Sequence, residues 1–241
     1  MNNFDDIEQY KLNHPDIADT ISEVQSIYDL TIRHINHEFG NALTLVNSSL
    51  QIIQSSHPEI KKIKYWESTM EDVQYLVKLV SDISNLYNCN NIRKDRCNIN
   101  TLIDNIIQSV SKITSDTDIN INFEKNESIP LITGDSLKLR QVFINLIKNA
   151  CEAVDNKGEI NIKTDISGSD NCVTIEISDT GCGIPEEYIN SIFQPLISHK
   201  HNGCGLGLAI SNRIISSHNG TISVDSTPGS GTTFLISLPT A

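Results

Sequence analysis

Basic residues, aromatic residues and long apolar runs are all scarce in this chain of 241 residues. Lysine and arginine together number 18 against 30 aspartate and glutamate residues, so the formal net charge is −12. A surface built mainly for nucleic acid would carry the opposite charge. No segment approaches the roughly 20 consecutive apolar residues that a membrane-spanning helix needs, and the N-terminal stretch MNNFDDIEQY is too acidic and polar for a secretory signal. We therefore expect a cytoplasmic protein with no nucleic-acid partner and no direct membrane insertion.

Cysteine pairs of the C-x-x-C type are also absent. The six cysteines are Cys89, Cys97, Cys151, Cys172, Cys182 and Cys204. This spacing indicates neither a zinc site nor a disulfide framework, so we expect reduced, mostly structural thiols. Cys182 and Cys204 lie in glycine-rich stretches, and a redox effect on those loops stays open as an alternative.

Apolar residues three and four positions apart predict two long helices in the first part of the chain. The first is expected over about 23–55, and Pro58 ends it because proline is not tolerated inside a helix. The second is expected over about 59–88. We place the resulting antiparallel hairpin at residues 23–88, after a polar N-terminal segment of residues 1–22. A single hairpin buries its apolar stripe poorly, so we expect two copies to pair as a four-helix bundle, which makes the protein a homodimer.

The rest of the chain alternates between helical and strand patterns, after a polar linker at residues 89–98. One helix is expected near 101–114 and another over about 135–154. Strands are expected in ININ, GEINIKTDIS and NCVTIEISDT, and a terminal hairpin that turns at PGSG is expected from GTISVDST and GTTFLISLP. The fold class is therefore α+β, a helical hairpin followed by an α/β-sandwich domain at residues 99–241.

Two amides share one face of the helix expected over 135–154. Asn145 and Asn149 are four residues apart, which places them about one helical turn from each other. Amides among apolar residues are costly unless they are satisfied. Amide oxygens on one helix face could ligate Mg²⁺, while phosphate oxygens and water fill the other positions. The alternative left open by this segment is a pair of asparagines on a solvated helix edge.

Two glycine-rich stretches follow this helix. In ISDTGCGIP a predicted strand ends at Asp179, and Gly181 and Gly183 permit a tight turn with close ligand approach. A carboxylate there can accept a hydrogen bond from an exocyclic amine. HNGCGLGLAIS places further glycines before a helix, where backbone N–H groups can bind an anion. It is neither a Walker A loop nor a Rossmann fingerprint, and each stretch alone is also compatible with an ordinary turn.

Taken together and in this order, the stretches resemble the ATP-binding domain of sensor histidine kinases, a fold shared with heat-shock chaperone, gyrase and mismatch-repair ATPases. The resemblance covers roughly residues 97–240 and implies ATP and Mg²⁺ as ligands. It implies that Asn149 ligates Mg²⁺, with help from Asn145, and that Asp179 reads adenine. IFQPLISHK is similar to the start of a flexible lid over the phosphates. The further nucleotide-binding residues that the resemblance implies are Gly181, Gly183, Lys200, Gly203, Gly205, Leu206, Gly207 and Thr232.

HEFGNAL, in the first predicted helix, resembles the phosphoacceptor motif of the same family. Helical geometry indicates that His37 and Asn41 share a turn and face solvent, opposite the stripe of Phe39. The resemblance implies that His37 accepts the γ-phosphoryl group of ATP and that Glu38 orients the imidazole and accepts its proton. It also implies that Asn41 can position a water that hydrolyses an aspartyl phosphate on the receiver domain of a response regulator. The histidines expected to be ordinary surface residues are His34, His199, His201 and His218.

The motif departs from the family pattern at two positions. Gly40 stands in place of a basic residue, and Ala42 stands in place of the usual proline, whose absence removes an expected kink. NACEA, which contains Glu152, resembles the nitrogen-regulation type. No sensor domain is obvious in the sequence, which leaves a separate sensor protein as a further candidate partner.

The primary expectation is an ATP-dependent protein-histidine kinase of a two-component system. A phosphotransferase or phosphatase of such a relay, with a regulatory nucleotide-binding domain, is the alternative. Two further alternatives are a serine/threonine kinase that acts as an anti-sigma switch and a mechanical ATPase. The HEFGN helix argues against both.

Overall fold

The computed structural model describes residues 14–89, 92–114, 117–168, 171–198 and 204–240. The chain forms two compact units, Met1–Tyr87 and Asn88–Ala241. Within the described ranges, every helix is too short or too polar to span a bilayer. Four residues discussed above lie outside the described residues: His199, Lys200, His201 and Gly203.

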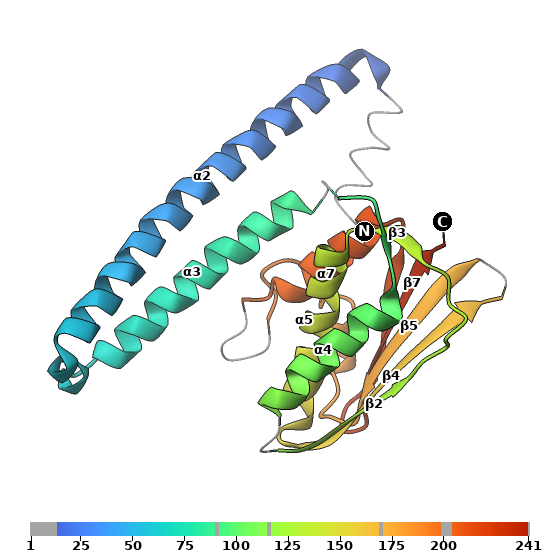
Figure 1. The fold of residues 1–241 in the computed structure, drawn as a ribbon. Coiled ribbons are helices and arrows are strands. Elements are labelled where there is room, and N and C mark those ends of the chain that lie inside the picture. Colours follow the sequence, from blue (N-terminus) through green and yellow to red (C-terminus); the bar gives the residue numbers. More distant parts are fainter. Residues whose placement is uncertain (1–13, 90–91, 115–116, 169–170, 199–203, 241) are drawn as a thin grey trace. The chain divides into compact units, whose positions relative to one another are not determined.

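The first unit is an antiparallel helical hairpin (Figure 1). Helix α2 (Pro15–Ser56) and helix α3 (Trp66–Asn88) are joined by a 3₁₀ turn, η1 (Pro58–Lys62). α2 starts earlier than expected, because a proline in the first turn already has a helical φ and needs no N–H partner. α3 starts later than expected, because η1 and Tyr65, whose φ is +73°, interrupt the helical path.

The hairpin leaves much apolar surface uncovered. Ile32, Leu43 and Leu50 of α2 are half-buried. Met70 of α3 is the one buried hydrophobic side chain among the described residues of this unit. The large apolar side chains of α2 that remain exposed are Ile17, Val24, Ile27, Tyr28, Leu30, Ile35, Phe39, Leu45, Val46, Ile52 and Ile53. One copy of the hairpin therefore does not bury the stripe that the sequence pattern predicts.

The second unit is a five-stranded sheet with helices on one face (Figure 1). The strand order is β2-β4-β5-β7-β6, in which β2 and β4 are parallel and the other neighbouring pairs are antiparallel. The strands are β2 (Asp118–Glu124), β4 (Lys157–Ser167), β5 (Cys172–Asp179), β6 (Thr221–Thr227) and β7 (Gly231–Pro239). The helices are α4 (Ile99–Ile113), α5 (Ser136–Val154), α6 (Glu186–Ile189) and α7 (Gly207–Ser217).

The core of this unit lies between the sheet and its helices. Val173, Ile175 and Ile177 alternate along β5 and are at most 1% exposed. Phe143 and Leu146 of α5 are completely buried. Together with the hairpin, this packing confirms the predicted α+β class and gives the site a rigid base.

The stretch expected to be a linker contains regular structure. β1 (Asp95–Cys97) pairs antiparallel with β3 (Ile132–Gly134), and Cys97 is only 4% exposed. The expectation of a polar linker was therefore wrong for residues 95–97. A three-residue strand is too short to show an alternation of apolar and polar residues, which is also why β3 was not predicted.

His218 is buried, contrary to the expectation of a surface residue. It is the C-cap residue that follows α7, and its exposed fraction is 5%. Its Nε2 accepts the backbone N–H of Asp135 at 2.9 Å, and its Nδ1–H donates to the carbonyl of Ile214 at 2.7 Å. The ring thus joins the end of α7 to the start of α5. The sequence pattern could not show this contact, because the two residues are 83 positions apart.

Candidate functional site: an asparagine row between two glycine-rich loops and an exposed histidine

One face of α5 carries the centre of the candidate site. Asp135 caps the helix, because its carboxylate accepts two backbone N–H groups of the first turn. Asn145, Asn149 and Ala153 follow at intervals of four residues, so they form one row along the helix. Each end of this row contacts a different glycine-rich loop.

The Asn145 end of the row contacts the glycines at the start of α7. The Asn145 amide Nδ2–H donates to Ser211 Oγ at 3.0 Å, and Ser211 Oγ–H donates to the Gly207 carbonyl at 2.9 Å. A Cβ added to Gly207 would lie 2.5 Å from Asn145 Oδ1. Only glycine lets the loop approach the amide this closely.

The Ala153 end of the row contacts the loop that follows β5. A Cβ added to Gly181 would lie 2.6 Å from the Ala153 carbonyl oxygen, and the Cys182 N–H donates to that oxygen at 3.1 Å. Asn149, which is half-buried, therefore lies on α5 between the two glycine-rich loops. The structure brings Asn145, Gly207, Asn149 and Gly181 together along one helix.

Asp179 lies at the end of β5 and is 8% exposed. Its Oδ1 accepts the N–H of Gly181 at 2.8 Å. Its partner across the strand pair is Thr232 of β7, which is 5% exposed. Directly opposed residues of an antiparallel pair share a face of the sheet, so the two predicted adenine-site residues stand side by side.

Ser226 of β6 extends this pair and was not predicted as a site residue. It is the partner of Thr232 in the β6–β7 ladder, and its hydroxyl lies 2.9 Å from Thr232 Oγ1. The Ile184 N–H also donates to Ser226 Oγ, at 2.8 Å. The signal that could have found it is its place on the inward side of an alternating strand, where Ile222 and Val224 precede it.

Gly183 and Gly205 anchor the two loops. Gly183 has a φ of +69°, and a Cβ there would lie 2.2 Å from the Thr227 carbonyl oxygen. Gly205 has a φ of +65°, and its carbonyl accepts the Leu196 N–H at 3.0 Å. Leu206, the N-cap residue that precedes α7, is 1% exposed. The described part of the expected lid is therefore held at Leu196 by the second loop.

The predicted phosphoacceptor lies on α2, in the first unit. The His37 side chain is 73% exposed and that of Glu38 is 62% exposed. His37 Nδ1 lies 3.7 Å from Glu38 Oε1 and 3.2 Å from the Asn41 amide nitrogen. In the contact with Asn41 the amide N–H donates and Nδ1 accepts, whereas a proton on Nδ1 would face the Glu38 carboxylate, and that second tautomer leaves a lone pair on Nε2. The three residues predicted from HEFGNAL therefore form one exposed cluster.

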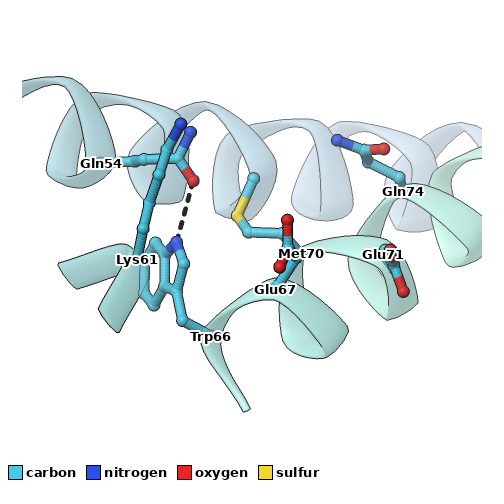
Figure 2. Close-up of a pocket in the computed structure, with 7 residues that line it drawn as sticks. All are labelled: Gln54, Lys61, Trp66, Glu67, Met70, Glu71 and Gln74. Atoms are coloured by element: carbon cyan, nitrogen blue, oxygen red, sulfur yellow. Dashed lines mark hydrogen bonds between the residues drawn. The ribbon is translucent and has the colours of Figure 1, made fainter. Parts of the chain in front are cut away.

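A separate groove of about 240 Å³ lies at the turn of the hairpin (Figure 2). The Trp66 indole N–H, which points toward α2, donates to Gln54 Oε1 at 2.9 Å. The groove is lined by Gln54, Lys61, Trp66, Glu67, Met70, Glu71 and Gln74. It contains none of the predicted site residues.

Nowhere in the described part of the chain do three His, Cys, Asp or Glu side chains gather as a metal site made of such ligands would require.

Comparison with known proteins gives a consistent result. Residues 134–241 match the family described as histidine kinase-, DNA gyrase B-, and HSP90-like ATPase. Over 216 residues the chain is 33% identical to the sensory histidine kinase/phosphatase NtrB of Rhodobacter capsulatus. This match covers 85% of this chain and 60% of NtrB. The chain spans about half the length of the curated relatives it matches.

Solved structures agree with the architecture. The catalytic domain of histidine kinase ThkA, in a nucleotide-free form, is 31% identical, with a TM-score of 0.55, and the match covers 61% of this chain and 95% of that domain. The complex of ThkA with the response regulator protein TrrA is 24% identical, with a TM-score of 0.64, and the match covers 96% of this chain and 67% of that chain. Because the match to the complex is only 24% identical, it shows a similarity of fold alone.

Proposed function

The chain belongs to the sensor histidine kinase family, and from this membership we propose that it is an ATP-dependent protein kinase that phosphorylates its own His37. The observation that carries the proposal is the row of Asn145, Asn149 and Ala153, which is contacted by a glycine-rich loop at each end. Such loops let backbone N–H groups approach phosphates closely. The phosphoryl group would then pass to an aspartate of a response-regulator receiver domain.

Asp179 and Thr232 hold the adenine in this proposal, beside the turn made by Gly181 and Gly183. Asn149 ligates Mg²⁺, with Asn145 as a second candidate. The residues fit this ion, because Mg²⁺ keeps several waters and takes few protein oxygens besides phosphate. When bound, the ion neutralises phosphate charge. The residues proposed to enclose the phosphates are Lys200, Gly203, Gly205, Leu206 and Gly207.

His37 acts as the nucleophile. Its Nε2 lone pair attacks the γ-phosphorus, the bond from that phosphorus to the β–γ bridging oxygen breaks, and ADP leaves with the bonding electrons. Glu38 holds the proton on Nδ1 before attack and accepts it from the imidazolium that forms. Its Oε1 lies 3.7 Å from Nδ1, beyond hydrogen-bonding distance, so the role requires a small rotation of the Glu38 side chain toward the ring.

A phosphatase activity toward the receiver domain is the second candidate. Asn41 lies one turn from His37, with the amide 3.2 Å from the ring. An amide there can orient a water toward an aspartyl phosphate bound at His37. The name of NtrB, which describes a kinase/phosphatase, is consistent with both activities.

The exposed apolar side chains of α2 support a homodimer that pairs two hairpins. The ThkA–TrrA complex is consistent with a response regulator as the second partner. We also propose that a separate sensor protein is a partner of this chain and that the chain is located in the cytoplasm.

The test is incubation with γ-labelled ATP and Mg²⁺, followed by treatment of the protein with acid or alkali. We expect label that survives alkali and is lost in acid. His37→Gln should abolish it without affecting ATP binding, and His34→Gln, another exposed histidine of α2, is the matched control. Label that persists in His37→Gln would refute the assignment. Normal ATP binding without label would favour the phosphatase or phosphotransferase.

A further inference from the structure

Ser226, Thr232 and Asp179 form one row across three neighbouring strands. Ser226 and Thr232 are partners in the β6–β7 ladder, and Thr232 and Asp179 are partners in the β7–β5 ladder. Partners of this kind place their side chains on the same face of the sheet. Thr232 and Asp179 are buried and Ser226 is half-buried.

The Ser226 hydroxyl has three neighbours within hydrogen-bonding distance. The Ile184 N–H lies 2.8 Å away, the Gly231 carbonyl oxygen 2.9 Å away and Thr232 Oγ1 2.9 Å away. A serine hydroxyl supplies one proton and two lone pairs. These three contacts therefore use its whole hydrogen-bonding capacity.

Counting protons fixes the direction of each bond. A backbone N–H can only donate, so Ile184 takes one lone pair of Ser226. A carbonyl can only accept, so the Ser226 proton goes to Gly231. The Thr232 hydroxyl must then donate its own proton to the remaining lone pair of Ser226. Thr232 is left with lone pairs, so it offers an acceptor to any ligand beside it.

We infer that Ser226 is a specificity-determining positioning residue, which fixes the Thr232 hydroxyl as an acceptor so that the site selects 6-amino purines over 6-oxo purines. The inference rests on the proposed function, because it assumes that the base lies against Asp179 and Thr232. The Asp179 carboxylate and Thr232 then both present acceptors. An exocyclic amine has protons to donate to them. The oxygen of a 6-oxo purine has none, so it meets only lone pairs.

The experiment measures the equilibrium affinities of ATP and inosine triphosphate, each with Mg²⁺, for the full chain. Wild type should bind ATP more tightly. Ser226→Ala should lower the ratio of the two affinities about tenfold, because the Thr232 proton is released and can turn toward the 6-oxo group. Ser226→Thr keeps a hydroxyl at this position and should preserve the ratio. Ser223→Ala, at an exposed serine of the same strand, is the matched control.

Thr232→Val gives an independent reading, because it removes the acceptor while Ser226 keeps its hydrogen bonds to Ile184 and Gly231. It should weaken ATP and leave inosine triphosphate nearly unchanged, so the ratio falls again. A purely structural role predicts that Ser226→Ala weakens both nucleotides equally, and an unchanged ratio would overturn the inference while leaving the kinase proposal intact. A wild-type chain that binds neither nucleotide would instead overturn the proposed function, and the inference with it.

Discussion

The backbone N–H of Asp135 donates to Nε2 of the buried His218 across 2.9 Å, which ties the N-cap of α5 to the C-cap of α7. α5 carries the asparagine row and α7 begins at the second glycine-rich loop. The two elements of the site are therefore joined at the ends opposite to the ones that face the nucleotide loops.

His218→Phe should destabilise the second unit. It leaves the Asp135 N–H without its partner in a buried place, which costs about 1–3 kcal/mol of unfolding free energy. Chemical denaturation of the full chain, followed by circular dichroism of the sheet, measures the loss. His57→Phe is the matched control, since the His57 side chain is 66% exposed. Equal stability of the two variants would contradict the structural role of the buried ring.

Asp135 should make the stability of the second unit depend on pH. Burial alone would raise the pKa of its carboxyl, but hydrogen bonds from the Arg93 N–H and two N–H groups of α5, with the charge of Lys138, hold the pKa below its usual value. Because the folded pKa lies below the unfolded value of about 3.9, the carboxylate stabilises the fold above that pH. This contribution is lost as the pH falls through the folded pKa.

Thermal unfolding between pH 6 and pH 2 tests this dependence. Asp135→Asn should show a smaller loss of melting temperature on acidification than the wild-type chain. Asp155→Asn, at an exposed residue after the same helix, provides the comparison. If the wild-type and Asp135→Asn profiles run parallel, the carboxylate does not stabilise the folded state in this way.

Gly207→Ala should disrupt the contact between α5 and α7. Its Cβ would lie 2.5 Å from Asn145 Oδ1, and overpacking of this kind costs about 1–3 kcal/mol. Adding Asn145→Ala removes the clashing amide, so the double variant should recover part of the loss. A double-mutant cycle of melting temperatures measures this coupling. Strict additivity of the two changes would count against the contact.

Gly40→Ala should stabilise the hairpin by about 1 kcal/mol, because alanine favours the helix over glycine by that amount. The position can accept the change, since the new Cβ would lie 3.6 Å from Val80 Cγ1, an ordinary van der Waals distance. Helical melting followed by circular dichroism checks the prediction. A loss of stability would show that glycine is needed there for bending or for closer packing.

Asn149→Ala should remove the gain in nucleotide affinity that Mg²⁺ provides, while affinity measured in a chelator changes little. The amide oxygen is the ligand proposed for the ion, so the effect belongs to the metal and not to adenine. Calorimetric titration with ADP, with and without Mg²⁺, separates the contribution of the metal to nucleotide affinity from the contribution of the rest of the nucleotide. Asn105→Ala, at an exposed position on α4, should keep the full dependence. Retention of the Mg²⁺ effect in Asn149→Ala would exclude that role.

The parts of the fold that were predictable depend on patterns that are local in the sequence. The spacing of apolar residues predicts α2 and α5, and the alternation along β5 predicts a strand that ends at Asp179. Asp135 is a residue type that often begins a helix, and the structure places it as the cap of α5. Periodicity is a property of a short window, so it can be seen without knowing the fold.

The contacts that were missed join residues distant in the sequence. His218 looks like a surface histidine until its partner, 83 positions earlier, is known. Ser226 looks like an ordinary strand residue until β7 and the loop at Ile184 are placed beside it. β1 and β3 stabilise each other over only three residues each. In every case the deciding partner comes from the tertiary fold, which a local pattern cannot contain.

Because one copy leaves the apolar face of α2 uncovered, the stability of the hairpin depends on the concentration of the protein. If two copies must meet to cover it, each tenfold dilution removes about 1.4 kcal/mol from their association. The sheet unit, whose core is closed within one chain, would lose nothing on dilution. The cellular concentration of this chain would then set how much of it holds an ordered His37 helix.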